Sequence, residues 1–261
     1  ASTTPQQPAP PAAVTAAALA PPTVPSAMTE PPAPAEPPGP AATVPGKLRM
    51  PPSMALQYEV KATRKGVTLP ASSTLRFTHD GTQYDARLEI KALMVGSRTQ
   101  TSKGTIDPVA GLQPLRFGDK TKSEQATHFD RSLATPALRF SANTPDIPLQ
   151  PYTQDRLSVL FQLAAMLAGD AQGVARQQAL TIHTAGTKDA DLWQFRVAPA
   201  DTLHLPAGTM TAVHLIRKPL HAYDNQVEVW LAPDLHHLPV RVLWTQANGD
   251  VVDQRLSGHS P

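Results

Sequence analysis

The sequence predicts a mostly β protein in which one long, curled antiparallel sheet forms a half-barrel, plugged by one buried α-helix and preceded by a disordered Pro/Ala-rich tail. Three observations support this fold class. Apolar and polar residues alternate from Met54 to about Ser257, with turn dipeptides between the runs. Residues 155–168 instead carry helical periodicity, and proline and alanine dominate residues 1–52.

The N-terminal segment has the composition of a spacer. It contains 16 of the chain's 29 prolines and no aromatic residue, so it cannot bury a hydrophobic core. We therefore predict a disordered spacer over residues 1–52, an antiparallel β half-barrel over residues 53–257 and a flexible C-terminus over residues 258–261. The chain opens at Ala1 without methionine, which fits a processed product, and we expect membrane association only through an anchor absent from this chain.

Glycine-containing turns divide the predicted half-barrel into hairpins. Asp80-Gly81 lies between two alternating runs within residues 73–90 and can supply the positive φ angles of a tight turn. Asn248-Gly249 and Lys65-Gly66 predict two further hairpins. The remaining predicted strands are residues 98–106, 112–120, 125–129, 137–140, 179–183, 192–197, 211–217 and 226–231.

Residues 155–168 form the one helix that the sequence predicts. Asp155 falls in its first turn, and Gly169 stands at its C-terminal stop. At about 3.6 residues per turn, the apolar side chains surround most of the helix instead of forming a stripe. A helix that is apolar all round must be buried, here by the sheet.

Charge and cysteine content exclude several functional classes. The chain has 23 Lys+Arg against 21 Asp+Glu, so it lacks the basic excess typical of nucleic-acid-binding proteins. It has no cysteine, which excludes disulfides, thiolate zinc sites and cysteine nucleophiles. The histidines show no metal-binding spacing, although His204 and His214 could face each other across a hairpin, and we predict neither a metal nor a cofactor.

Catalytic signatures are missing as well. The sequence has no GxSxG nucleophile elbow and no glycine-rich phosphate loop, so we expect a protein without enzymatic activity. Hydrolysis by Asp and His side chains that converge from separate strands is the less favoured alternative. A pocket that holds His183 or His204 within hydrogen-bond reach of a carboxylate would support it.

Three stretches carry a resemblance to a known family: residues 56–67 (LQYEVKATRKGV), 203–215 (LHLPAGTMTAVHL) and 227–254 (VEVWLAPDLHHLPVRVLWTQANGDVVDQ). They resemble DUF3108, a bacterial domain family of unknown function, and the likeness extends from about Met54 to Leu256. Members of that family look like exported or inner-membrane-tethered envelope proteins of Gram-negative bacteria. The resemblance therefore implies a periplasmic location, but no functional residues, because the family has no assigned activity.

A weaker, fold-level likeness is to the lipoprotein carriers of the periplasm, whose curled sheet and plugging helices enclose an apolar cavity. It rests on a strand ending at residues 230–233 (WLAP), a following strand that opens at residues 238–240 (LPV), and the Asn248-Gly249 hairpin. This likeness implies a mechanism in which a sheet closed around a movable helix exposes an apolar pocket.

The leading hypothesis is a non-enzymatic periplasmic envelope protein that binds an apolar or amphipathic ligand, such as a lipid, or a partner protein in its curled sheet. The alternative is a scaffolding module that recruits an envelope partner through its sheet edge. Core packing is one interpretation of the helix and the C-terminal aromatic residues, and a cavity lining is the other. The candidate lining residues are Phe161, Leu163, Met166, Leu167, Trp193, Phe195, Trp230 and Trp244.

Overall fold

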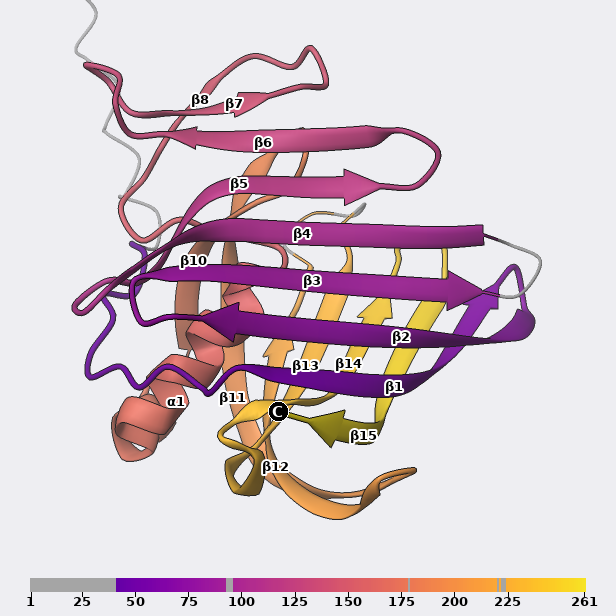
Figure 1. Cartoon of the computed structure of the whole chain (residues 1–261). Coiled ribbons are helices and arrows are strands. Elements are labelled where there is room, and N and C mark those ends of the chain that lie inside the picture. The colour runs from indigo at the N-terminus through magenta and orange to yellow at the C-terminus, as the bar shows by residue number, and fades with distance from the viewer. Residues whose placement is uncertain (1–40, 93–95, 178, 220, 222–223) are drawn as a thin grey trace, which may run out of the picture. The chain divides into compact units, whose positions relative to one another are not determined.

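The structure, a computed structural model, describes residues 41–261 except 93–95, 178, 220 and 222–223. Most of the spacer predicted over residues 1–52 therefore lies outside the described residues. The described chain forms one 15-stranded sheet and one α-helix (Figure 1). The predicted curled, mostly β fold with a single helix is confirmed.

The observed strands extend most of the predicted ones by a few residues. They are β1 (Met54–Arg64), β2 (Val67–His79), β3 (Gln83–Ala92), β4 (Gly96–Asp107), β5 (Gly111–Lys120), β6 (Glu124–Asp130), β7 (Ala137–Phe140), β8 (Ile147–Pro148), β9 (Gln154–Asp155), β10 (Ala179–Ala185), β11 (Ala190–Leu205), β12 (Gly208–Arg217), β13 (Gln226–Ala232), β14 (Leu238–Thr245) and β15 (Val251–Ser260). The helix α1 spans Ser158–Arg176, and a short 3-10 helix, η1, follows β13 at Pro233–Leu235. No helix in the described part of the chain combines the length and hydropathy that a membrane crossing requires. Positive φ angles at Gly66, Gly81 and Gly249 confirm the three predicted turns.

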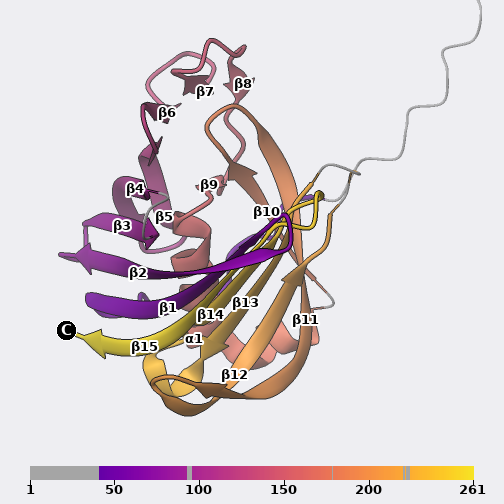
Figure 2. The ribbon, with the colours of Figure 1, turned by 90° about the vertical axis from the view of Figure 1, so that its right-hand side faces the viewer.

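The strand order places the first and last strands side by side in the middle of the sheet. The order is β8-β7-β6-β5-β4-β3-β2-β1-β15-β14-β13-β12-β11-β10-β9, and β1 pairs with β15 antiparallel. Strands β1–β8 therefore form one wall and β10–β15 the other, and β9, which precedes α1 in the chain, adds to β10 in parallel. Figure 2 shows α1 between the two walls.

Side-chain hydrogen bonds tie the two walls together near the start of α1. The Gln154 amide donates to the Leu112 carbonyl at 2.8 Å, and the Thr127 hydroxyl donates to the Gly186 carbonyl at 2.6 Å. The terminal strands β8 and β9 are not neighbours in the strand order. The half-barrel is thus closed on this side by a few side chains and not by a ladder of backbone bonds.

The first half of α1 is packed inside the sheet. Every residue from Ser158 to Leu167 is at most 5% exposed. Phe161 stacks on Phe77 of β2 with ring centroids 4.2 Å apart. The Gln162 amide is buried as well, and it is satisfied by the backbone of the β4–β5 region, accepting from the Leu112 N–H at 2.9 Å. The predicted burial of the helix by the sheet therefore holds for this half.

The helix begins later and ends later than the predicted residues 155–168. Asp155 lies in β9, where its Oδ1 accepts hydrogen bonds from the N–H groups of Leu157 and Ser158, while the Ser158 hydroxyl accepts from the Asp155 N–H. This reciprocal pattern starts the helix at Ser158. Gly169 does not end it, because the backbone only kinks at Asp170, and the helix continues, largely exposed, to Arg176.

The boundaries of the folded unit also differ from the expected ones at both ends. Residues 41–50, which we call the strap, pack on the domain although the prediction places them in the spacer. The Thr43 N–H donates to the Thr181 carbonyl of β10 at 2.6 Å, and the Arg49 N–H donates to the Ala165 carbonyl of α1 at 3.0 Å. At the other end, Ser260 still pairs with Ala55, so the expected flexible C-terminus continues β15.

Gly169 gives a test of how the strap docks. A Cβ atom at this position would lie 2.0 Å from the Lys47 carbonyl oxygen and 2.8 Å from the Leu48 nitrogen, and neither backbone atom can move without shifting the strap. We expect Gly169→Ala to lower the free energy of unfolding by about 1–3 kcal/mol, although alanine normally favours a helix. Urea denaturation measures this. Gly46→Ala, in the strap with open space around it, is the control, and equal stability of the two variants would refute the close approach.

Candidate functional site

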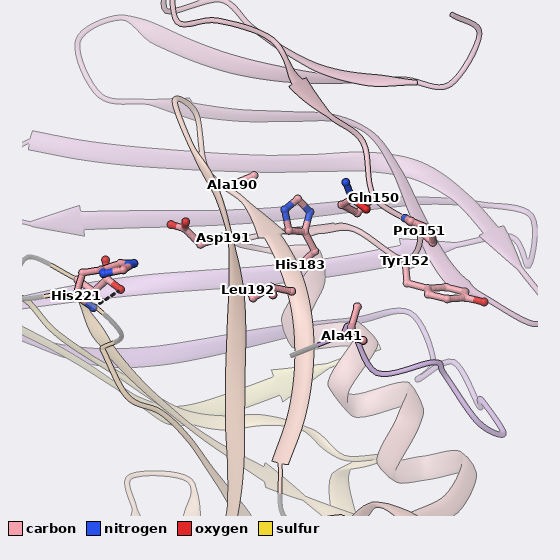
Figure 3. Close-up of a pocket in the computed structure, with 11 residues that line it drawn as sticks. Ala41, Gln150, Pro151, Tyr152, His183, Ala190, Asp191, Leu192 and His221 are labelled. Atoms are coloured by element: carbon pink, nitrogen blue, oxygen red, sulfur yellow. Dashed lines mark hydrogen bonds between the residues drawn. The ribbon is translucent and has the colours of Figure 1, made fainter. Parts of the chain in front are cut away.

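A solvent-open recess lies at the end of the β10–β11 hairpin (Figure 3). Its volume is about 640 Å³, within the range of about 300–1,000 Å³ typical of small-molecule sites. The loop before β9, the two strands of the hairpin and the strap all contribute to it. Among its lining residues are Ala41, Pro151, Tyr152, His183, Ala190 and Leu192.

His183 of β10 lies at the centre of the recess, and its hydrogen bonding fixes its tautomer. The Thr153 hydroxyl donates its one proton to the Gln150 carbonyl at 2.7 Å and lies 2.9 Å from His183 Nδ1. The ring must therefore donate from Nδ1, which leaves Nε2 as an acceptor in the neutral form. Burial lowers the pKa of His183, so the neutral ring prevails at pH 7.

The charged groups of the recess are acidic. Asp191 of β11 and Asp224 both line it, and the lining contains no Lys or Arg among the described residues. Asp224 Oδ2 accepts from Arg217 at 3.1 Å and from the His221 N–H at 3.3 Å, the bond drawn in Figure 3. A neutral acceptor beside carboxylates favours ligands that donate hydrogen bonds or carry positive charge.

A second, smaller hollow of about 90 Å³ lies inside the sheet, and we call it the inner cavity. It is bounded by β3 and β4 on one wall and by β14 and β15 on the other. Its lining includes Ile90, Arg98, Arg156, Trp244 and Val252. It is therefore a hollow of mixed character, with apolar side chains and guanidinium groups side by side.

Most of the eight residues predicted to line a cavity are packed together in the hydrophobic core. The core includes Phe161, Leu163, Met166, Leu167, Trp193, Phe195 and Trp230. Trp244 contacts Trp193 edge-on with ring centroids 5.8 Å apart, and it lines the inner cavity. A ligand-lining role for these core residues stays a prediction, and for those on α1 and β11 it would require α1 to move.

Trp230 is placed on the other face of the sheet. It alternates along β13 with Val227 and Val229, so its ring points away from theirs. The ring stacks on His214 with centroids 4.2 Å apart, Arg241 lies 4.5 Å from it, and its indole N–H donates to Asp201 at 2.7 Å. Trp230 is only 4% exposed, and residues of β11, β12 and β14 therefore bury it on this face, away from the helix.

The histidines do not pair as the sequence suggests. The turn at residues 206–208 is present, but it pairs Leu205 with Gly208, so His204 lies opposite Thr209. His214 lies five residues further along β12, opposite Ala198. His204 bonds to Thr209, whereas His214 contacts Glu228 at 2.9 Å. Neither lines the recess or the inner cavity, and the described residues contain no group of three or more His, Asp or Glu side chains arranged to hold a metal.

Sequence reasoning missed the recess altogether. Its residues come from a loop, a hairpin end and the strap, which approach one another only because β9 adds to β10 in parallel. A two-residue strand such as Gln154–Asp155 carries no alternation that could predict this pairing. His183, named for a possible hydrolytic pocket, was the one recess residue that the sequence analysis had singled out.

Comparison with protein families gives a clear match. The model described as "Protein of unknown function (DUF3108)" matches residues 57–255, which is most of the chain. The chain belongs to the DUF3108 family. No curated protein sequence matches this DUF3108 chain.

Solved structures resemble this DUF3108 domain in fold. A β-barrel-like protein of domain of unknown function DUF1849 from Brucella abortus aligns with a TM-score of 0.53 and 9% identity over 82% of this chain and 98% of that chain. A putative outer membrane lipoprotein-sorting protein domain from Vibrio parahaemolyticus aligns with a TM-score of 0.27 and 8% identity over 80% of this chain and 85% of that chain. At these identities the first match shows a shared fold, and we draw nothing from the second.

Proposed function

We propose that this DUF3108 domain is a non-enzymatic periplasmic protein that binds an amphipathic envelope component in the recess. The observation that carries the proposal is a hollow of about 640 Å³ in a domain whose helix is packed to near-complete burial from Ser158 to Leu167. Apolar groups of Ala190 and Leu192 offer a surface for a hydrocarbon chain, and polar groups around them can orient a head group.

The head group favoured by the recess is neutral or cationic. His183 offers Nε2 as an acceptor, and Asp191 adds negative charge. A fatty-acid carboxylate would meet repulsion there, whereas a hydroxyl or an ammonium group would find acceptors. An amine-bearing or sugar-bearing amphiphile therefore fits better than a free fatty acid.

Two considerations support binding over catalysis. Hydrolysis would need a histidine bonded to a carboxylate. His183 and His204 instead bond to threonine hydroxyls. His214 does contact carboxylates, but its ring is stacked on Trp230. The periplasmic location rests on the family resemblance described above.

A scaffolding role through the sheet edge finds less support. Both terminal strands, β8 and β9, have only two residues, and β8 ends in Pro148, which has no backbone N–H. An added strand would therefore find few free backbone groups on them. Binding at the β10 edge would have to displace the strap from Thr181.

A fluorescence displacement assay tests the recess. The full chain is loaded with the neutral probe N-phenyl-1-naphthylamine and titrated with dodecylamine, dodecyl glucoside or dodecanoate. We expect the amine and the glucoside to displace the probe at concentrations at least about tenfold below those needed for dodecanoate, since one unfavourable charge contact of about 1.4 kcal/mol gives this factor. Absence of probe binding would refute the proposal.

A matched pair of variants locates the binding. Leu192→Asp places a charge in the apolar wall of the recess, and Leu69→Asp places the same charge at an exposed position of β2. We expect only Leu192→Asp to abolish probe binding. Equal binding by both variants would show that the probe occupies another surface.

A further inference from the structure

The inner cavity has the composition of a site for a small anion. Leu88, Ile90, Trp244 and Val252 form its apolar lining, and Arg98 and Arg156 form its charged lining. The remaining lining groups are amides, and none of the described lining residues is Asp or Glu. The hollow thus differs in sign from the recess, whose charged lining residues are Asp191 and Asp224.

Each lining arginine forms an ion pair with a carboxylate that does not line the cavity, and each has further N–H groups that this pair does not use. Arg98 donates through Nε and Nη2 to Asp119, and Arg156 donates through Nη2 alone to Asp189 at 2.9 and 3.1 Å. A guanidinium group has five N–H donors, so both side chains retain unused ones. The Asp189 side chain is 52% exposed, and solvent therefore screens its charge.

One of the unused donors is buried without a partner. Arg156 Nε has no exposed surface and no hydrogen bond among the described residues. An unsatisfied buried donor is unfavourable, and an acceptor that enters the cavity could relieve it.

A third guanidinium stands behind the cavity wall. The Arg217 side chain is 4% exposed and lies 4.9 Å from the centre of the Trp193 ring. It donates to the carbonyl of Asn225, a lining residue, and to Asp224. Its Nε is likewise buried and without a partner among the described residues. Positive charge therefore approaches the cavity from β4, from the residue after β9 and from the end of β12.

The size of the cavity limits its occupant. A volume of 90 Å³ is far below the about 300–1,000 Å³ of typical small-molecule sites. A carboxylate or phosphate with a short apolar substituent fits this space, and a full acyl chain does not. The apolar substituent would lie against Trp244 and Ile90.

We propose that the inner cavity binds a small organic anion, a carboxylate or phosphate that carries a short apolar substituent, through Arg98 and Arg156. The recess and the inner cavity have different lining residues, so this proposal stands independently of the function proposed for the recess.

Three probes of matched length separate charge from hydrophobicity: butyrate, butylammonium and butanol. Each is titrated into the ¹⁵N-labelled full chain, and the indole N–H resonances are followed. We expect butyrate to shift the Trp244 resonance saturably and to leave Trp230 unchanged, because the Trp230 indole is bonded to Asp201 on the opposite face. Equal shifts from butylammonium would contradict the proposal. Inorganic phosphate, as a free anion, should bind more weakly than butyrate, and equal affinity would refute the role of the apolar lining.

Arg156→Gln should weaken butyrate binding at least about tenfold, because it removes a charge-assisted hydrogen bond to the anion. Arg116→Gln removes the same charge from an exposed pair with Glu124 and should leave the affinity unchanged. If Arg156→Gln does not fold, the double variant Arg98→Gln/Asp119→Asn removes the other lining arginine together with its partner and should show the same loss. Affinities within twofold of the wild type in the folded variant would overturn the proposal.

Discussion

Replacing Leu163 with alanine is expected to lower the free energy of unfolding by about 2–5 kcal/mol. The side chain is 0% exposed in the middle of α1, where the sheet surrounds it. Truncation would leave a void that the rigid sheet cannot fill by collapse, so the lost contacts add to the lost hydrophobic burial. Urea denaturation followed by circular dichroism measures the change.

Leu115→Ala is the matched control for this experiment. Leu115 is 49% exposed on β5, so its truncation should change the stability by less than about 0.5 kcal/mol. A loss below about 1 kcal/mol for Leu163→Ala would indicate that the residue lines an open pocket and not a packed core. It would then favour the helix-side cavity that the sequence suggests.

Replacing Asp155 with alanine should destabilise the domain by about 3 kcal/mol or more at pH 5. Its carboxyl group is fully buried and accepts from the Leu157 and Ser158 N–H groups, and Ser102 of β4 lies 2.5 Å from its other oxygen. Each buried donor left without an acceptor costs about 1–3 kcal/mol. The same change also releases the start of α1 from the β4 wall. Thermal unfolding should show a clear loss, and a midpoint equal to that of the wild type would contradict this anchoring role.

Asp155 also predicts a dependence of stability on pH. Burial, as the largest cause, raises its pKa from the usual 3.8 to about 6. The folded state therefore holds this proton more tightly than the unfolded state, and the resulting stabilisation is complete below about pH 4 and lost as the pH rises through 6. We expect the stability of the wild type relative to Asp155→Asn to fall by about 2 kcal/mol between pH 4 and pH 7.

An exposed carboxylate is the control for the direction in which stability changes with pH. Asp107 accepts from the Val109 and Ala110 N–H groups, and these bonds lower its pKa. Its contribution is present above its unfolded pKa and lost as the pH falls, which is the opposite direction. If Asp155→Asn and Asp107→Asn changed the profile in the same direction, the burial account of Asp155 would be wrong.

The sequence predicted the sheet well because its signals are local. The period-two alternation from Tyr84 to Ile90 and the turn glycines each depend on a few neighbouring residues. The helix ends were harder, since Asp155 caps from a strand and Gly169 serves the close approach of the strap. Both roles depend on contacts between segments far apart in the chain.

The candidate sites depended on such contacts even more strongly. The sequence could identify apolar and aromatic side chains, but it could not show whether Phe161 meets a void or stacks on Phe77. It also grouped Trp230 with the aromatic residues that face the helix. Trp230 follows Val229 directly on β13, so its side chain lies on the opposite face of the sheet, where it stacks on His214. His183 became part of a recess only through a parallel pairing that no local pattern encodes.

Methyl NMR of the full chain titrated with dodecyl glucoside tests most directly where an amphiphile binds. The resonances of Ala190 and Leu192 report on the recess, and those of Leu163, Met166 and Leu167 report on the helix inside the sheet. Our account predicts saturable shifts for the first group and none for the second. Shifts confined to the helix methyl groups would contradict it and would show that α1 moves to admit the ligand.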